Sequence, residues 1–483
     1  MKILLILVSF ALVHANGQEL AEFRLASYYT NNMVLQMEPK SAVIWGYGQP
    51  DAEAVISYES NRLSTTIDAN GEWSITLPPH PPSESIDFAV QQISSFGMVT
   101  IPLKAAFGDV WVCSGQSNMA MSLNLIYNAS EEINKTIANY QHFRLRKVSR
   151  NTSLDVELDE ATFNYDWTAP EEERVPNFSA LCILFAERLS DAVNAAFPIG
   201  LIDATWPGTR IEAWSSSRVL EYCNTPLATN ETNRNADSAL WNAMIAPLTR
   251  TSVKGAIWLQ GEQNIDYNED YYACHILTLV NDWKRTFFQG ELAGENGVAF
   301  PFGVVQNGPV WINYNYKWGD IRWHQTVDLG VLPNALLPDA FTAASYDLTD
   351  HLSPTGSIHP RDKQTVADRL ANAARRLIYN ENLSLYGPVP VSVDQLAADS
   401  RTITYDRNVK LVGAAGFAFQ LPDGNYELSD VIASTANSVT VAVNSTAVQL
   451  LYAFSSYICE YKQCAVYSDD FENLPAQAWK WDL

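Results

Sequence analysis

The sequence has little positive charge and, beyond its first residues, no apolar segment long enough to cross a membrane. Lysine and arginine number 31 against 54 aspartates and glutamates, a formal net charge of −23 over 483 residues. Nucleic-acid phosphates require a basic face, and anionic membranes attract basic segments. We therefore expect neither nucleic-acid binding nor membrane insertion.

Sequence motifs for metal and nucleotide chemistry are also missing. The chain contains no HExxH, no CxxC pair and no glycine-rich phosphate loop. The turn at 115–119, Gly-Gln-Ser-Asn-Met, resembles a G-x-S-x-G nucleophile elbow but lacks its second glycine. We expect no metal and no cofactor.

Cysteine is scarce, with six residues. Cys459 and Cys464 flank only EYKQ and can close a small local loop, while Cys223 and Cys274 are a second candidate pair. Cys113 and Cys182 lie in apolar runs, so we expect both to be buried free thiols.

The first residues predict entry into the secretory pathway. Residues 1–17 have an early lysine, an apolar core of about a dozen residues and a small residue at the end, as in a signal peptide. The alternative, a membrane anchor, needs about 18 or more apolar residues. Asn-x-Ser/Thr sequons support a lysosomal or extracellular glycoprotein. They lie at Asn128, Asn134, Asn151, Asn177, Asn230, Asn382 and Asn444.

Three regions follow the leader. Residues 18–106 contain short runs punctuated by Gly, Pro and Asn, which predicts a β-sandwich domain. Residues 107–383 alternate buried strands and helices, which predicts an α/β catalytic domain with a mainly parallel sheet and helices on both faces. Residues 384–483 return to strand-like runs and predict a β-region packed on that domain. Strands are expected at 110–114, 199–206, 254–260 and 302–306, and helices at 178–197, 270–288 and 361–379.

Polar, glycine-containing turns follow three of these strands. They read SGQSN, WPGTRIEAW and QGEQN, and a fourth polar stretch, GSIHPRDK, opens the last helix. Because the carboxyl ends of parallel strands share one edge of a sheet, we expect these segments to converge there. Ser117, in the first turn, either caps the next helix or acts as a nucleophile.

A nucleophilic serine needs a base and donors for the oxyanion. Among the histidines, His359 stands at the entrance of the last helix and is the candidate base. Candidate donors are the backbone N–H groups of Ser117 and Gly208 and the side chain of Gln260 or Asn264. Glu262 either orients substrate hydroxyls or supports its loop by hydrogen bonding.

Several motifs together resemble the sialate O-acetylesterase family of SGNH hydrolases. They are GDVWVCSGQSNM, GTRIEAW, WLQGEQN, IRWHQT and GSIHPRDKQTVADRL, and CEYKQC is similar to the animal lysosomal and secreted members. The resemblance implies an SGNH-hydrolase-like sheet and removal of O-acetyl groups from sialic acids, chiefly at the 9-position, without a cofactor. It implies that Ser117 is the nucleophile and His359 its base. Ser117 N–H, Gly208 and the QGEQN turn then occupy the oxyanion-hole positions.

The chain departs from the family pattern at two places. Many SGNH enzymes have an aspartate three residues before the histidine, where this chain has Gly356. We take Asp350 as the orienting acid; Asp347, Asp362 and a Ser–His dyad helped by a backbone carbonyl remain alternatives. Arg210 is the second departure, and it either faces the sialate carboxylate or forms a surface salt bridge.

The expected substrates are O-acetylated sialoglycans or free O-acetylated sialic acid. Two rival interpretations remain: an acetylesterase for other acetylated glycans such as xylan, and a non-catalytic secreted glycan-binding protein. Intact Ser117 and His359 favour an enzyme. The oligomeric state is not predicted.

Overall fold

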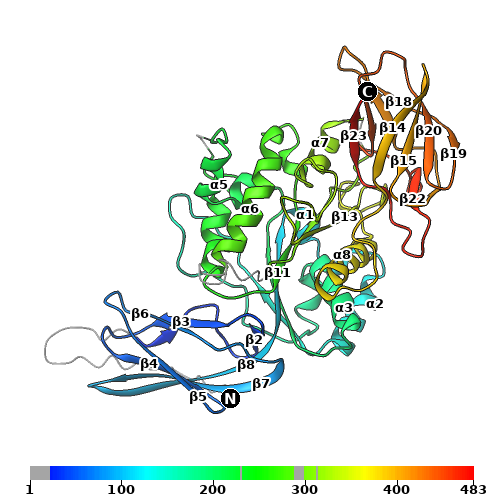
Figure 1. Cartoon of the computed structure of the whole chain (residues 1–483). Helices are drawn as coiled ribbons and strands as arrows, with labels where there is room; N and C mark the ends of the chain where they lie inside the picture. Colours follow the sequence, from blue (N-terminus) through cyan, green and yellow to red (C-terminus); the bar gives the residue numbers. More distant parts are fainter. Residues whose placement is uncertain (1–21, 229–230, 288–298, 312–313) are drawn as a thin grey trace.

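The computed structural model describes residues 22–228, 231–287, 299–311 and 314–483. The predicted leader and Asn230 lie outside these residues. The chain forms a layered β-structure at its N-terminus, a central α/β unit and a set of C-terminal antiparallel sheets (Figure 1). The α/β fold class with flanking β-regions is therefore confirmed.

The N-terminal region places a small antiparallel sheet beside a larger one. The small sheet has the order β1-β3-β6, and the larger one runs β8-β7-β4-β5 through antiparallel neighbours. Apolar side chains of both sheets, such as Trp45 and Ile56, belong to one buried core. The strands are β1 (Arg24–Leu25), β2 (Met33–Gln36), β3 (Val43–Tyr47), β4 (Glu53–Tyr58), β5 (Asn61–Thr66), β6 (Glu72–Thr76), β7 (Ser83–Ser94) and β8 (Gly97–Gly115).

Strand β8 belongs to two regions at once. Its residues 97–107 pair with β7, and its residues 109–115 lie between β10 and β11. The predicted domain boundary after residue 106 therefore falls inside one continuous strand. In its second half, Val110 and Val112 join one core and Trp111 and Cys113 join the other, so both faces are buried and the run is uniformly apolar.

The central sheet is parallel throughout, with the order β9-β10-β8-β11-β12-β13. After β8, the chain adds β9 and β10 on one side of it and then β11, β12 and β13 on the other, so the strand order reverses at β8. Such a switch point is where open α/β sheets bind ligands, outside the carboxyl ends of the strands. The further strands are β9 (Phe143–Lys147), β10 (Ile199–Thr205), β11 (Gly255–Leu259), β12 (Phe302–Val305) and β13 (Ala340–Ala343).

Helices cover both faces of this sheet (Figure 1). Helices α3 (Ala180–Ala192) and α8 (Lys363–Tyr379) pack in the core that includes Trp111. Helix α6 (Tyr272–Thr286) packs in the opposite core, and α5 (Ser217–Tyr222) lies against it.

The disulfides correct one expectation and confirm two. Cys113 on β8 and Cys182 on α3 are bonded, with their Cα atoms 5.8 Å apart, so the expectation of free thiols is wrong. The apolar runs that suggested isolation bury both residues in one layer between sheet and helix, which brings the sulfurs together. The pairs Cys223–Cys274 and Cys459–Cys464 form as predicted.

The C-terminal region is built from antiparallel sheets around a third core. Two four-stranded sheets have the orders β14-β15-β20-β19 and β18-β17-β21-β23, and β16 pairs with β22. The strands are β14 (Pro390–Ala397), β15 (Ser400–Tyr405), β16 (Val409–Leu411), β17 (Phe417–Gln420), β18 (Tyr426–Leu428), β19 (Val431–Ser434), β20 (Ser438–Ala442), β21 (Gln449–Tyr452), β22 (Val466–Ser468) and β23 (Trp479–Asp482).

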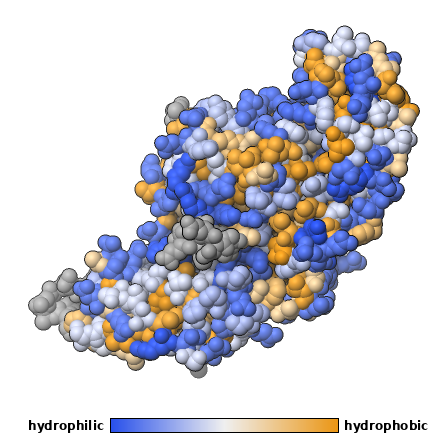
Figure 2. Space-filling model, in the orientation of Figure 1, coloured by the Kyte–Doolittle hydropathy of each residue, from blue (hydrophilic) through white to orange (hydrophobic). Residues whose placement is uncertain are grey.

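The surface mixes polar and apolar residues. Figure 2 shows hydrophilic and hydrophobic residues interspersed over the visible face, with a hydrophobic area on the central unit. Within the described ranges, no helix is both long and apolar enough to cross a bilayer. The described sequon asparagines are all exposed: Asn128, Asn134, Asn151, Asn177, Asn382 and Asn444.

Candidate active site

Ser117 lies at the carboxyl end of β8, at the switch point of the sheet. The strand ends at Gly115, which has φ +132° and approaches β11 so closely that a Cβ atom would stand 2.1 Å from the Leu259 carbonyl oxygen. Only glycine allows this approach. Ser117 then begins the short helix α1 (Ser117–Ala120) and is half-buried. Its N–H lies in the first turn, where backbone N–H groups have no acceptor within the helix.

Gln116 joins the serine turn to the QGEQN turn. Its side-chain oxygen accepts hydrogen bonds from Gln260 Nε2 at 3.1 Å and from the backbone N–H of Gln263 at 3.2 Å. The Gln116 backbone N–H donates to the Leu259 carbonyl at 3.0 Å. The first and third predicted turns therefore meet, as the parallel sheet requires.

Asn118 connects the nucleophile turn to the histidine loop. Its Nδ2 donates to the Ile358 carbonyl at 2.9 Å and to Glu262 Oε1 at 2.8 Å, and its Oδ1 accepts from Lys363 Nζ at 2.9 Å. Asn118 follows Ser117, and Ile358 precedes His359. This one buried side chain thus places the neighbours of both predicted catalytic residues within hydrogen-bond distance of each other.

The ring of His359 has a defined tautomer when it is neutral. Its Nδ1 lies 2.8 Å from the carbonyl oxygen of Thr355. Because a carbonyl only accepts, Nδ1 carries the proton and Nε2 keeps its lone pair, which is the arrangement a general base requires. His359 is half-buried at the end of a turn that includes Gly356, at φ +92°.

The predicted orienting acid, Asp350, has a different partner. Its carboxylate accepts hydrogen bonds from Arg361 Nε at 2.7 Å and Nη2 at 2.8 Å, and from the Arg361 backbone N–H at 3.1 Å. Burial raises the pKa of Asp350, but these bonds outweigh it, and the pKa is lowered overall. The expectation that Asp350 orients His359 is corrected: Asp350 joins the two ends of the histidine loop, and the Thr355 carbonyl takes the orienting position.

The other two candidate acids are engaged as well. Asp347 is bound by Arg369 at 2.6 and 2.8 Å and accepts from the Tyr467 hydroxyl. Asp362 caps α8 by accepting from the Thr365 backbone N–H. Each therefore stabilises the segments on either side of His359.

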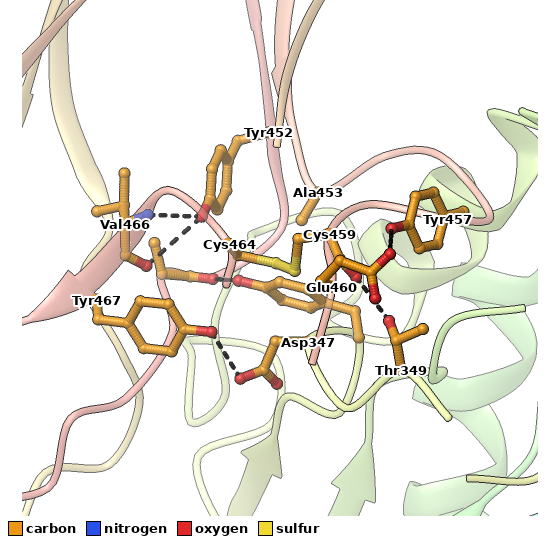
Figure 3. Close-up of a disulfide and its surroundings, with 12 residues drawn as sticks. Asp347, Thr349, Tyr452, Ala453, Tyr457, Cys459, Glu460, Cys464, Val466 and Tyr467 are labelled. Carbon is orange, nitrogen blue, oxygen red and sulfur yellow. Dashed lines mark hydrogen bonds between the residues drawn. A yellow bond between two sulfur atoms is a disulfide. The ribbon is translucent and has the colours of Figure 1, made fainter. Parts of the chain in front are cut away.

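The C-terminal region supports the histidine loop through the short loop closed by Cys459–Cys464 (Figure 3). Thr349 donates to the Cys459 carbonyl at 2.7 Å. The Lys462 backbone N–H donates to the Asp347 carbonyl at 2.7 Å. The Tyr461 hydroxyl donates to Asp362 at 2.6 Å. The segment that carries His359 is therefore held from a second region of the protein.

Gln260 and Asn264 lie inside the protein, away from solvent. Gln260 Nε2 donates to the Thr209 carbonyl at 3.0 Å and to Asn264 Oδ1 at 2.8 Å, and both side chains are 0% exposed. Asn264 Nδ2 donates to Glu212 at 2.8 Å. These amides hold the turns in place and have protein acceptors for the hydrogens that were expected to face an oxyanion.

Gly208 carries the remaining predicted donor, its backbone N–H. It has φ +68° and is half-buried in the turn after β10. The neighbouring Trp206 N–H donates to the Gly115 carbonyl at 3.0 Å, which joins the second turn to the first. All four polar segments predicted to converge therefore do so.

Two buried charged groups lie behind the serine and the histidine. Glu262 is 8% exposed; burial raises its pKa, while Asn118 and the nearby His359 lower it in part. Lys363 is 3% exposed, and burial lowers its pKa to about 8. Sequence reasoning missed Gln116, Asn118 and Lys363, although the first two flank Ser117. Within the described ranges, no three His, Cys, Asp or Glu side chains are grouped to hold a metal ion.

The fold and the converging turns define a carbohydrate esterase. Residues 107–293 match the family "Carbohydrate esterase, sialic acid-specific acetylesterase", and residues 392–483 match "Sialate O-acetylesterase C-terminal domain". A solved carbohydrate acetylesterase from Xanthomonas citri superposes with a TM-score of 0.78 at 25% identity, covering 95% of this chain and 99% of its own.

Similarity to curated proteins identifies the family. The chain is 40% identical to the sialate O-acetylesterase of Pongo abelii and 39% identical to that of Homo sapiens, covering 92% of this chain and 90% of each relative. The chain belongs to the sialate O-acetylesterase family.

Proposed function

We propose that this esterase hydrolyses O-acetyl groups of sialic acids, 9-O-acetyl groups foremost, through an acetyl-enzyme on Ser117. One observation carries the proposal: Asn118 Nδ2 donates to the Ile358 carbonyl at 2.9 Å, which brings together the segments of Ser117 and His359. Family membership supplies the substrate class, because the curated relatives are named sialate O-acetylesterases.

The reaction proceeds in two acyl transfers. Ser117 Oγ attacks the acetyl carbonyl while His359 Nε2 takes the hydroxyl proton, and the tetrahedral oxyanion accepts from the N–H groups of Ser117 and Gly208. The ester C–O bond then breaks, and the imidazolium returns its proton to the departing sugar oxygen. Water attacks the acetyl-enzyme with His359 again as base, releasing acetate and restoring Ser117.

The sequence also supports passage through the secretory pathway. Disulfides persist in oxidising compartments, and the exposed sequon asparagines are accessible to glycosylation. We include a cleaved signal peptide and a lysosomal or extracellular location in the proposal. Peptide mapping of protein secreted from animal cells, before and after removal of N-glycans, tests both.

Acetate release from a panel of esters tests the activity. The panel contains 9-O-acetyl-N-acetylneuraminic acid, acetylated xylan and 4-nitrophenyl acetate. We expect the first to have the highest kcat/KM and Ser117→Ala to lose at least about 1,000-fold on every ester. A fluorophosphonate probe should label the wild type and not Ser117→Ala.

Other outcomes would identify a rival function. A higher kcat/KM on acetylated xylan would replace the substrate class while keeping the mechanism. Folded wild-type protein that neither releases acetate nor reacts with the probe would indicate a glycan-binding protein.

A further inference from the structure

An exposed arginine without a carboxylate partner lies on the Gly208 turn. Arg234 Nε donates to the Gly208 carbonyl at 3.3 Å, and its Nη2 would stand 3.1 Å from a Cβ atom on Gly208. Within the described ranges, no carboxylate lies within ion-pair distance of Arg234. Its guanidinium therefore keeps hydrogen-bond donors available at the turn that carries the Gly208 N–H.

A second arginine lies at the start of the same turn. Arg150 Nε donates to the Thr205 carbonyl at 3.1 Å, at the carboxyl end of β10. It too has no ion-pair partner among the described residues. Burial lowers the pKa of Arg150. The negative charge of Asp203 raises this pKa in part, and the positive charge of Arg234 lowers it further, so the two guanidinium groups are close enough to interact electrostatically.

Arg210, the arginine first considered for this purpose, is already engaged. Its Nη1 lies 3.4 Å from Glu231 Oε1, and its guanidinium carbon lies 3.5 Å from the centre of the Tyr267 ring. A guanidinium with a carboxylate on one edge and an aromatic ring on its face has less positive potential to offer a ligand. The protein environment thus favours the salt-bridge interpretation of Arg210, whereas neither Arg234 nor Arg150 forms an ion pair with a described residue.

Two arginines without an ion-pair partner among the described residues therefore lie at one turn of a chain whose net charge is −23. The turn they flank is joined to Gly115, two residues before Ser117, by the Trp206 hydrogen bond. Positive potential close to the nucleophile attracts an anionic substrate, and the planar fork of an arginine matches a carboxylate through two hydrogen bonds.

We propose that Arg234 binds the carboxylate of the sialic acid substrate, with Arg150 adding positive potential behind it. This inference rests on the proposed function. It identifies Arg234 as the residue that lets the enzyme distinguish acidic from neutral acetylated sugars. Arg234 anchors the sugar at the Gly208 turn, and the acetyl ester extends from there towards Ser117.

A pair of substrates that differ only in charge tests the inference. They are 9-O-acetyl-N-acetylneuraminic acid and its carboxyl methyl ester, and the quantity measured is the ratio of their kcat/KM values. This ratio is independent of the fraction of enzyme that is folded. We expect Arg234→Gln to lower the ratio about tenfold, mainly through KM of the acid, and Arg234→Lys to lower it less.

Salt and a matched variant provide the controls. In the wild type the ratio should fall with ionic strength, and in Arg234→Gln this dependence should weaken. Arg401, on β15, also donates only to backbone carbonyls, those of Ala397 and Ser400. Arg401→Gln should leave the ratio and its salt dependence unchanged.

The outcomes separate this inference from the function on which it rests. Equal losses on acid and methyl ester in Arg234→Gln would overturn the carboxylate role while leaving the esterase function standing. A wild type that hydrolyses neither substrate, yet reacts with the serine probe, would remove the sialate substrate itself.

Discussion

At the scale of single residues, Asn118 determines how the serine turn and the histidine loop fit together. Its three hydrogen bonds reach Ile358, Glu262 and Lys363. A buried partner left unsatisfied costs about 1–3 kcal/mol. We expect Asn118→Leu to lower kcat by about 10–100-fold with a smaller change in KM, measured by acetate release.

Two variants make the Asn118 prediction specific. Asn118→Asp keeps the shape but places a carboxylate against Glu262 and removes the donor to Ile358, so its kcat should fall at least as far. Asn124→Ala removes an exposed asparagine that only accepts from Ser122 and should retain wild-type kcat. Full activity of Asn118→Leu would contradict the positioning role.

Lys363 gives the protein a stability term that depends on pH. Burial lowers its pKa to about 8, whereas an unfolded lysine titrates near roughly 10.4. Between these values the unfolded state binds more protons than the folded state, so the contribution of Lys363 to the free energy of unfolding rises with pH. Below pH 8 both states are charged and the contribution is constant.

Urea unfolding of the wild type and Lys363→Met at pH 7.5 and pH 10 measures this term. The wild type should gain about 1–3 kcal/mol relative to the variant over that interval. If the difference in unfolding free energy between wild type and variant is the same at both pH values, folding does not lower the pKa of Lys363.

The orienting partner of His359 could not be found from residue types. The search ran over aspartates, and the structure uses the carbonyl of Thr355, a group that every residue possesses. A backbone acceptor leaves no signature in the sequence. Asp350, Asp347 and Asp362 were candidates because they lie near His359 in the sequence. In the structure each of them stabilises the histidine loop or the helix that follows it.

At the scale of elements, one disulfide is expected to affect mainly stability and another mainly activity. Cys223–Cys274 closes a separation of 51 residues, and Cys459–Cys464 closes one of 5. Longer closed loops restrict the unfolded chain more, so the first disulfide should contribute more to stability. The second closes the loop that binds Thr349 and Asp347 and should contribute more to activity.

Paired serine variants test this difference. Cys223→Ser/Cys274→Ser should lower Tm by several degrees more than Cys459→Ser/Cys464→Ser. The latter should lower kcat about 3–10-fold, since the base is less well placed. Thermal melts and acetate release on both variants decide, and the reverse order of effects would refute the assignment.

The sequence predicted some strands of the central sheet and missed others. The sequence predicted the last part of β8 and strands β10, β11 and β12 from their short apolar runs, three of which are followed by polar turns. Strand β9 was missed because FRLRK has the composition of an exposed segment. In the structure Arg146 is only 2% exposed; its Nη1 donates to Asp166 and its Nη2 to the Ser27 carbonyl. Strand β13 reads AFTA and lacks the β-branched apolar residues that mark β12, FGVV, as a strand.

At the scale of the whole molecule, the central unit depends on the C-terminal region. Arg322 is 0% exposed, and its Nη1 donates to the carbonyls of Ala453 and Ser455 at 2.9 and 2.8 Å. Removing those acceptors would leave a buried guanidinium partly unsatisfied, which costs several kcal/mol. The conspicuous IRWHQT motif thus contains a structural contact between the two regions.

Truncation tests this dependence. A chain ending at residue 389 should be recovered mostly unfolded, as judged by circular dichroism, and should release no acetate. Arg322→Gln in the full chain should lower the free energy of unfolding by about 3–5 kcal/mol. A folded, active truncated protein would show that the central unit is autonomous.

The double membership of β8 has a consequence for how this protein tolerates insertions and deletions. Its first half is registered against β7 and its second half against β10 and β11. Side chains alternate between faces with period two, so removing one residue between these halves would invert every later side chain up to Ser117. Neither end can slip to compensate, because each is fixed by its own neighbours. The number of residues in this strand should therefore be the same in related proteins, whereas the lengths of the surrounding loops can differ.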